Sequence, residues 1–247
     1  MKSTDMNERL EELVVEMGAL RPAELHERLR QLVPSLPLRE RFELLHRLGV
    51  YHHADTVSGA ASTLSETSRL RAALPGLVEE RGVATMLDVP CGDFHWMQRV
   101  PFAGQYTGAD IVPEIVAANE RRHGAANRRF VVLDATRDPL PRVDLVLCRD
   151  LFVHLSNRDV QAVLRNLVAS GSRLLLTNHF RDRMENQDIE SGDFRALNLC
   201  CPPFRLPPPL TVVVEDSALA GGLFPDRAMA LWNLADVESS LGQSSPG

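Results

Sequence analysis

Lysine is almost absent from this 247-residue sequence: Lys2 is the only one, and the other 26 basic residues are arginine. The chain therefore lacks a core lysine for a phosphate-binding P-loop or for a Schiff base with pyridoxal phosphate. A genome rich in G and C would produce the same arginine bias. The net charge of −6 argues against a nucleic-acid partner, because binding to a phosphate backbone needs clustered positive charge.

The sequence also lacks C-x-x-C motifs, an export signal and long apolar runs. The four cysteines form no C-x-x-C pair, and the first 20 residues are acidic and amphipathic, unlike an export signal. No apolar run reaches the roughly 18 residues of a membrane helix. We therefore expect a reduced, cytoplasmic setting and no membrane. We also expect no metal site, because His52 and His53 lack partners at metal-ligand spacing.

The first 50 residues have the apolar periodicity of helices. Residues 9–20 carry a stripe of 3.6-residue period, Pro22 suits a first helical position, and residues 39–50 restart the pattern. A stretch rich in small and polar residues follows. We predict a helical cap and lid loop over 1–68. The cap either covers an active site or forms a homodimer contact, and the sequence leaves both open.

From Val83 onward, short apolar runs alternate with helical segments. The runs at 83–89, 106–111, 130–133, 143–148 and 173–177 predict strands, whereas 113–123 and 158–169 predict helices. This alternation is typical of βαβ units and an α/β fold with a parallel sheet. We expect one such domain over 69–238, closed by strands at 211–214 and 229–234, and a loose tail over 239–247.

Acidic residues follow three successive predicted strands. Asp88 ends the first and precedes a turn that contains Gly92, Asp110 ends the second, and Asp134 follows the third. Glycine lets a ligand approach the turn closely, and an acid about 20 residues later accepts hydrogen bonds from a ribose diol. The third carboxylate suits an adenine amine. Ordinary polar residues at strand ends are the alternative.

The sequence here resembles the class I S-adenosylmethionine-dependent methyltransferases, whose Rossmann-like sheet has seven mostly parallel strands. The matching stretches are MLDVPCGDF at 86–94, YTGADI at 106–111, VLDA at 132–135 and DLVLCRD at 144–150. Pro90 and Phe94 stand where the family usually has glycines. A bacterial subgroup is similar in having PCGDF before Trp96 and Met97, an upstream SGxxS element (58–62 here) and a proline-rich loop (202–209 here).

The resemblance implies S-adenosylmethionine as cofactor and assigns residues to its parts. Asp88, Pro90 and Gly92 shape the methionine pocket, Asp110 binds the ribose, Ile111 covers the adenine, Asp134 and Ala135 hold its edge, and Cys148 and Arg149 line the sulfonium side. Ser62 belongs to the upstream element. From the residues themselves, Arg71 or Arg69 could pair with the cofactor carboxylate. Tyr51, Phe94 and Trp96 could wall the sulfonium, with core packing as the alternative for Phe94.

Candidates for acid–base chemistry follow the fourth and fifth predicted strands. They are Asp150 and His154, then Asn178 and His179. Methyl transfer from a sulfonium mainly needs alignment and exclusion of water, and a base helps only when the acceptor loses a proton. A structural histidine at a helix start is the alternative for His154, and a loop histidine is the alternative for His179. Asn178 could orient an acceptor.

The sequence thus favours an enzyme that transfers a methyl group to a small molecule in a biosynthetic pathway. A second hypothesis keeps the cofactor but lets its own amine attack its γ-carbon, which gives azetidine-2-carboxylate and methylthioadenosine. A third is a cofactor-binding protein without catalysis. Asp110 and Asp134 argue against that third hypothesis, because a decayed site would not need to keep them.

Overall fold

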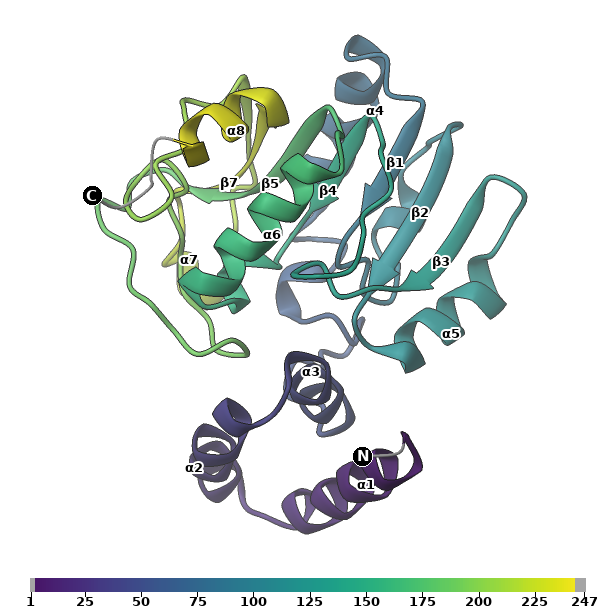
Figure 1. The fold of residues 1–247 in the computed structure, drawn as a ribbon, viewed down its shortest axis with the longest axis vertical. Helices are drawn as coiled ribbons and strands as arrows, with labels where there is room; N and C mark the ends of the chain where they lie inside the picture. Colours follow the sequence, from purple (N-terminus) through teal and green to yellow (C-terminus); the bar gives the residue numbers. More distant parts are fainter. Residues whose placement is uncertain (1–2, 243–247) are drawn as a thin grey trace.

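The computed structural model describes residues 3–242, and its centre is one seven-stranded sheet with the order β3-β2-β1-β4-β5-β7-β6 (Figure 1). The strands are β1 (Thr85–Asp88), β2 (Gln105–Asp110), β3 (Arg128–Val132), β4 (Leu145–Cys148), β5 (Leu174–Phe180), β6 (Thr211–Val214) and β7 (Arg227–Asn233). The first five are parallel, whereas β7 runs antiparallel to both β5 and β6. The predicted Rossmann-like architecture, with two closing strands, is confirmed.

Helices cover both faces of this sheet, which explains why its central strands read as unbroken apolar runs. On one face α4 (Ser68–Glu80) and α5 (Pro113–His123) pack on a cluster that includes Met86 and Leu147. On the other, α6 (Asn157–Ala169) and α8 (Leu234–Gly242) pack on a cluster around Leu87, Val146 and Trp232. All seven residues of β5 are buried between these layers.

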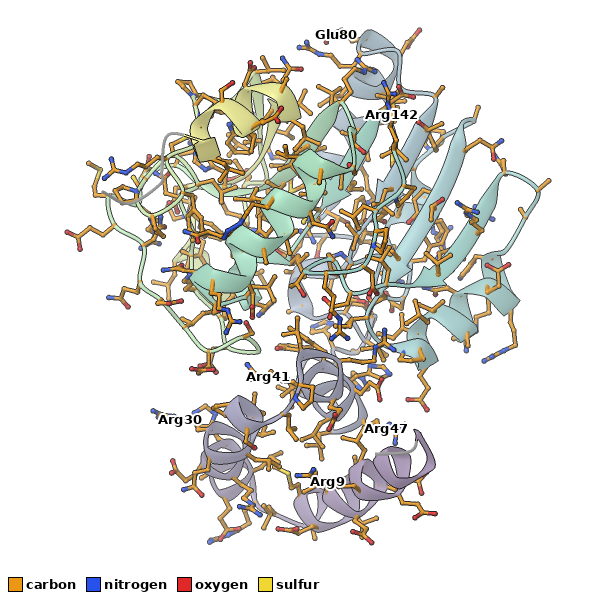
Figure 2. All side chains as sticks on the ribbon, in the orientation of Figure 1. Arg9, Arg30, Arg41, Arg47, Glu80 and Arg142 are labelled. Atoms are coloured by element: carbon orange, nitrogen blue, oxygen red, sulfur yellow. The ribbon has the colours of Figure 1, made fainter. Side chains whose placement is uncertain are left out.

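Three N-terminal helices form a cap beyond the carboxyl ends of the strands (Figure 1). They are α1 (Ser3–Gly18), α2 (Pro22–Leu32) and α3 (Leu38–Arg47), and they share a small core that includes Leu10, Met17 and Leu44. Arg41 projects from α3 (Figure 2) and donates to the Ser191 carbonyl at 2.7 Å. The guanidinium of Arg41 therefore ties the cap to the loop that follows β5.

The segment after β1 forms no α-helix. Residues 89–96 form turns, and only the short 3-10 helix Met97–Arg99 follows. Phe94 has a φ of 58°, a left-handed conformation that an α-helix does not accommodate. The predicted loose tail differs in part, because α8 continues through Gly242; residues 243–247 lie outside the described part. Within 3–242 no helix has both the length and the apolar character for crossing a bilayer.

Candidate functional site

A cavity of about 460 Å³ lies between the cap and the carboxyl ends of β1, β2 and β4. This is where open α/β sheets bind ligands, and the volume falls in the range of small-molecule sites. The sheet supplies the segments after its strands, and the cap supplies residues of α3 and the segment 50–53. The lining from the sheet side includes Pro90, Gly92, Trp96, Asp110, Ile111, Arg149, Asp150 and His154; the cap and lid loop add Phe42, His46, Tyr51 and Ser62.

The turn after β1 and the acid after β2 are joined by direct hydrogen bonds. The Gly92 amide donates to Asp110 Oδ2 at 3.2 Å, and the Val112 amide donates to Asp110 Oδ1 at 3.0 Å. Asn119 on α5 donates to the Gly92 carbonyl at 2.7 Å. Burial raises the pKa of Asp110 to about 6. Each carboxylate oxygen keeps acceptor capacity, so Asp110 is oriented for two neighbouring hydroxyl donors in the cavity.

The lid loop is fixed to this turn through Asp93. The Asp93 carboxylate accepts from the Thr56 hydroxyl at 2.8 Å, the Val57 amide at 3.1 Å and the Ser58 hydroxyl at 3.1 Å. The Asp93 amide in turn donates to Ser58 Oγ at 3.0 Å. The predicted loop and the predicted glycine turn therefore form one wall of the cavity.

Asp134 and Ala135 lie in a separate small hollow beside the main cavity. The hollow has a volume of about 30 Å³ and shares Ile111, Pro90, Phe42 and Leu151 with the larger cavity. Asp134 accepts from the Thr136 amide at 3.0 Å and pairs with Arg137 Nε at 3.1 Å. The surface beside Ile111 thus continues toward Asp134, as the order of the strands requires.

The cavity lining leaves out four other residues that were predicted to bind the cofactor: Asp88, Cys148, Phe94 and Arg71. Asp88 lies beneath it and accepts from the Tyr106 hydroxyl at 2.5 Å, and burial raises the pKa of Asp88 to about 7. Cys148 is fully buried in the core. Phe94 packs against Tyr106, Phe130 and His123, which corrects its expected place at the sulfonium.

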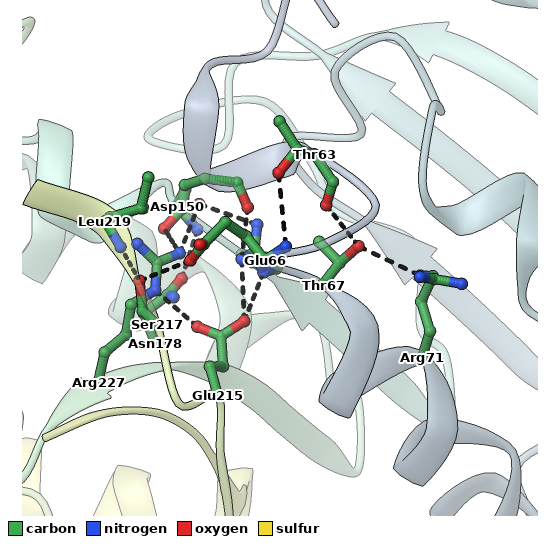
Figure 3. Close-up of polar contacts among 12 residues, drawn as sticks. Thr63, Glu66, Thr67, Arg71, Asp150, Asn178, Glu215, Ser217, Leu219 and Arg227 are labelled. Carbon is green, nitrogen blue, oxygen red and sulfur yellow. Dashed lines mark hydrogen bonds and ion pairs between the residues drawn. The ribbon is translucent and has the colours of Figure 1, made fainter. Parts of the chain in front are cut away.

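Arg71 also points away from the cavity. The Arg71 guanidinium donates to the Leu64 carbonyl at 2.6 Å. It also donates to Thr67 Oγ1 at 3.2 Å (Figure 3). Arg69 forms an exposed ion pair with Asp216 at 2.6 Å. Neither arginine therefore lies where the carboxylate role expected from the sequence would need it, because the first bonds to the segment that precedes its own helix and the second faces solvent.

A closed ring of four charged side chains forms one side of the cavity. Arg149 donates to Glu215 at 2.9 Å and to Asp150 at 3.0 Å. Arg227 donates to Glu215 at 2.7 Å and to Asp150 at 2.9 Å, and Figure 3 shows Arg227 between these two carboxylates. The ring alternates in sign and has no net charge. The Arg149 guanidinium also lies 5.7 Å from the centre of the Trp96 ring.

This ring makes Asp150 unsuited to the predicted role of general base. Although burial alone would raise its pKa, the two guanidinium groups lower the pKa of Asp150 to about 2. A base of such low pKa accepts a proton poorly at neutral pH. Asn178 accepts from the Asp150 amide at 2.5 Å. His179 is buried with its ring edge against Trp232. Neither of these two lines the cavity.

His154 is the predicted acid–base residue that the cavity does expose. Its Nδ1 lies 2.8 Å from the Asp193 carbonyl oxygen, and its ring packs tilted against that of Tyr51, which also lines the cavity, with ring centres 5.1 Å apart. Burial lowers the pKa of His154. Within the described residues, no three His, Cys, Asp or Glu side chains gather in a way that would hold a metal ion.

The comparisons with known proteins agree with the motif stretches. A family model described as a methyltransferase domain matches residues 86–170. This confirms the resemblance to the S-adenosylmethionine-dependent methyltransferases for the part of the chain that holds the glycine turn and the first four strands. A search of curated proteins found no match.

Solved structures with similar folds include several methyltransferases. The magnesium protoporphyrin IX methyltransferase of Synechocystis PCC 6803 is 17% identical, with a TM-score of 0.39 over 48% of this chain and 58% of that one. The amino pentose methyltransferase CalS10 of Micromonospora echinaspora is 18% identical, with a TM-score of 0.39 over 47% of this chain and 51% of that one. The N-methyltransferase NodS of Bradyrhizobium japonicum WM9 is 13% identical, with a TM-score of 0.49 over 70% of this chain and 98% of that one. The chain spans about half the length of the first structures that it matches.

Proposed function

We propose that this protein binds S-adenosylmethionine in the cavity and transfers its methyl group to a small molecule enclosed by the cap. The observation that carries the proposal is the joint between Gly92 and Asp110. It presents a glycine turn and an oriented carboxylate side by side at the carboxyl ends of neighbouring strands. A nucleoside needs this pair of features for close backbone approach and for a grip on its two hydroxyls.

The residues around the joint fit the parts of this cofactor. Asp110 would accept hydrogen bonds from the ribose hydroxyls, and Ile111 would cover one face of the adenine. The small hollow by Ala135 and Asp134 would receive the adenine edge. Trp96, Ser62 and the backbone of Arg149 would surround the methionine end, because they line the cavity on the side of the charged ring.

The bound cofactor would supply an activated methyl group, so the protein has to align the acceptor and exclude water. The cap performs both tasks in this proposal, since Phe42 and Tyr51 close the cavity opposite the sheet. A net charge of −6 and a cavity of about 460 Å³ favour a small acceptor over a nucleic acid. We propose that the protein acts in a biosynthetic pathway of the cytoplasm. We also propose that the chain consists of a cap and lid over 1–68 and a catalytic domain over 69–238.

Calorimetry with S-adenosylhomocysteine tests the cofactor site directly. Asp110→Ala removes both acceptors for the ribose, and we expect the Kd to rise at least about tenfold, which is the loss of one to two good hydrogen bonds. Asp216→Ala is the matched control, because Asp216 is an exposed acid paired only with Arg69. Equal affinity of Asp110→Ala and the wild type would contradict the proposed site.

A second measurement separates methyl transfer from cyclisation of the cofactor. The protein is incubated with S-adenosylmethionine alone, and the products are analysed by mass spectrometry. We expect no methylthioadenosine above the level of a protein-free control. Methylthioadenosine together with azetidine-2-carboxylate would replace methyl transfer by the cyclisation reaction while keeping the cofactor site.

A further inference from the structure

Four aromatic rings form a continuous wall on one side of the cavity, which we term the aromatic wall: Tyr51, His154, Phe194 and Phe224. Ring centres lie 5.1 Å apart between Tyr51 and His154, 5.7 Å between His154 and Phe194, and 5.6 Å between Phe194 and Phe224. All four residues line the cavity. They come from four separate segments of the chain, so the fold brings them together and no local sequence pattern does.

Backbone contacts hold the aromatic wall in place. The Tyr51 hydroxyl donates to the Gly192 carbonyl at 2.6 Å, and the Gly192 amide donates to the His154 carbonyl at 2.8 Å. The Arg195 amide donates to the Val153 carbonyl at 3.0 Å. The wall is therefore built before any ligand binds, and an aromatic ligand would gain ring contacts without having to order it.

The protonation state of His154 follows from its one hydrogen bond. A carbonyl oxygen only accepts, so at 2.8 Å from the Asp193 carbonyl the Nδ1 atom carries the hydrogen. In the neutral ring Nε2 then holds a free lone pair, and burial lowers the pKa of His154, which favours that neutral form. Among the described residues, the hydrogen bond to the His154 ring is the one between Nδ1 and the Asp193 carbonyl. A base is thus available in the middle of the aromatic wall.

The carboxylates around the cavity are all engaged elsewhere. Asp93 accepts from the lid loop, Asp110 accepts from two backbone amides, and Asp150 is held by the two arginines of the charged ring. With the remaining acceptor capacity of Asp110 taken by the ribose in the proposed function, none of these three carboxylates is left to pair with an ammonium group. An ammonium group would give up hydration on entering this cavity without a carboxylate to pair with, whereas a neutral planar molecule would not meet this cost.

On this basis, and resting on the proposed function, we propose that the acceptor is a planar aromatic molecule with a phenol-type hydroxyl. Its ring would lie on the aromatic wall, and its hydroxyl would donate to His154 Nε2. In the reaction the hydroxyl oxygen forms a bond to the methyl carbon as the bond from that carbon to sulfur breaks. The hydroxyl proton passes to Nε2 and then to solvent, and the sulfur leaves as a neutral thioether with the electron pair.

The experiment compares two probes that differ only in the hydroxyl, 4-nitrophenol and nitrobenzene, with the full-length protein saturated by S-adenosylhomocysteine. Calorimetry gives both affinities. We expect 4-nitrophenol to bind about tenfold more tightly, the equivalent of one good hydrogen bond. Its ultraviolet spectrum should also shift toward that of the phenolate. His154→Phe keeps a ring in the wall but lacks Nε2, so it should abolish the preference and leave nitrobenzene affinity within about twofold.

Tyr51→Leu provides a second variant. It should weaken the binding of both probes equally, because it removes a ring from the aromatic wall and leaves His154 in place. Equal affinity of the two probes for the wild type would overturn the inference without any variant. A preference retained in His154→Phe would also overturn it. If S-adenosylhomocysteine itself does not bind, the proposed function fails first, and that result is seen before any probe is added.

Discussion

Ser58 Oγ occupies the space that a side chain at Gly92 would need: a Cβ built on Gly92 would stand 2.2 Å from this oxygen. Gly92 also has a φ of 52°, in the left-handed region. The lid loop and the glycine turn are therefore in contact at a point where only glycine fits. This explains why the sequence carries its SGxxS element and its glycine turn together, although 34 residues separate Ser58 from Gly92.

We expect Gly92→Ala to lower the free energy of unfolding by about 2–4 kcal/mol, from strain in the backbone and from the clash with Ser58. It should also weaken the binding of S-adenosylhomocysteine, because the turn would shift relative to Asp110. Urea unfolding and calorimetry measure the two effects. In a Ser58→Gly background the cost of Gly92→Ala should fall by at least about 0.5 kcal/mol, since the clashing side chain is gone.

Gly76 offers the matched control for this substitution. It lies within α4, and a Cβ there would meet nothing within 4 Å. Gly76→Ala should stabilise the protein by about 0.5–1 kcal/mol, as expected for an interior helix position. Equal effects of alanine at the two glycines would contradict the steric explanation.

The ring of Arg149, Asp150, Glu215 and Arg227 predicts a specific pattern of non-additivity. Glu215→Leu leaves two guanidinium groups with one carboxylate, and we expect a cost of about 3–5 kcal/mol. Adding Arg227→Met restores balance, because Arg149 and Asp150 still pair at 3.0 Å. The double variant should therefore be more stable than Glu215→Leu alone, as measured by urea unfolding.

Arg69→Ala serves as the comparison for the ring, because Arg69 pairs with Asp216 at 2.6 Å but in solvent. This exposed pair should contribute less than about 1 kcal/mol. If Glu215→Leu costs no more than Arg69→Ala, or if the double variant is the least stable of all, the ring does not behave as one charge-balanced unit.

Asp88 predicts how stability changes with pH. Burial raises its pKa from 3.8 to about 7, so between these values the folded state binds a proton that the unfolded state has released. The contribution of the protonated carboxyl is complete below about pH 4 and is lost as the pH rises through 7. The wild type should lose up to about 4 kcal/mol over this interval from Asp88.

Asp88→Asn removes that titration while keeping an oxygen for the Tyr106 hydroxyl. We expect its free energy of unfolding to change less between pH 5 and pH 8 than that of the wild type, measured in urea. Glu80→Gln, on the exposed end of α4, should leave the wild-type slope unaltered. An identical slope in wild type and Asp88→Asn would show that this carboxyl does not titrate in the interval.

Arg41 links the cap to the loop that follows β5, so its replacement should loosen that contact. Arg41→Met removes the hydrogen bond to the Ser191 carbonyl, and we expect a loss of about 1–3 kcal/mol. Limited proteolysis should cut the segment after β5 faster than in the wild type. Arg30→Met, on the exposed side of α2, should not change the cleavage rate; equal rates for both variants would place the cap contact elsewhere.

The sequence was sufficient to predict the sheet and to place Gly92 and Asp110 at the same edge of it. Buried parallel strands appear as apolar runs, and their carboxyl ends meet at one edge, so residues after neighbouring strands come together without knowledge of side-chain packing. The same reasoning located His154 after the fourth strand. These inferences depend only on strand order and period.

Side-chain direction could not be predicted in the same way. Phe94 follows the glycine turn, but its left-handed backbone sends the ring into the core beside Tyr106. Arg71 follows the lid loop, but it bonds backward to the Leu64 carbonyl of its own segment. In each case one backbone angle or one local acceptor decides which way the side chain points, and a spacing rule carries no information about either.

Glu215 and Arg227 were missed because their partners are far away in the chain. Arg149 is 66 residues from Glu215, and Asp150 is 77 residues from Arg227. With 26 arginines in the sequence, no single one stands out. The remaining signal was an arginine at the start of an otherwise apolar strand, where a buried charge requires a partner.

The helices of the cap differ in whether they contribute side chains to the cavity. Within the described residues, α3 and the segment 50–53 supply side chains to the cavity, whereas α1 and α2 supply none and pack on their own small core. The first two helices thus support α3 through the small core that the three helices share. The shape of the cavity can therefore be altered on the cap side at Phe42, His46 and Val50, without changing α1 or α2.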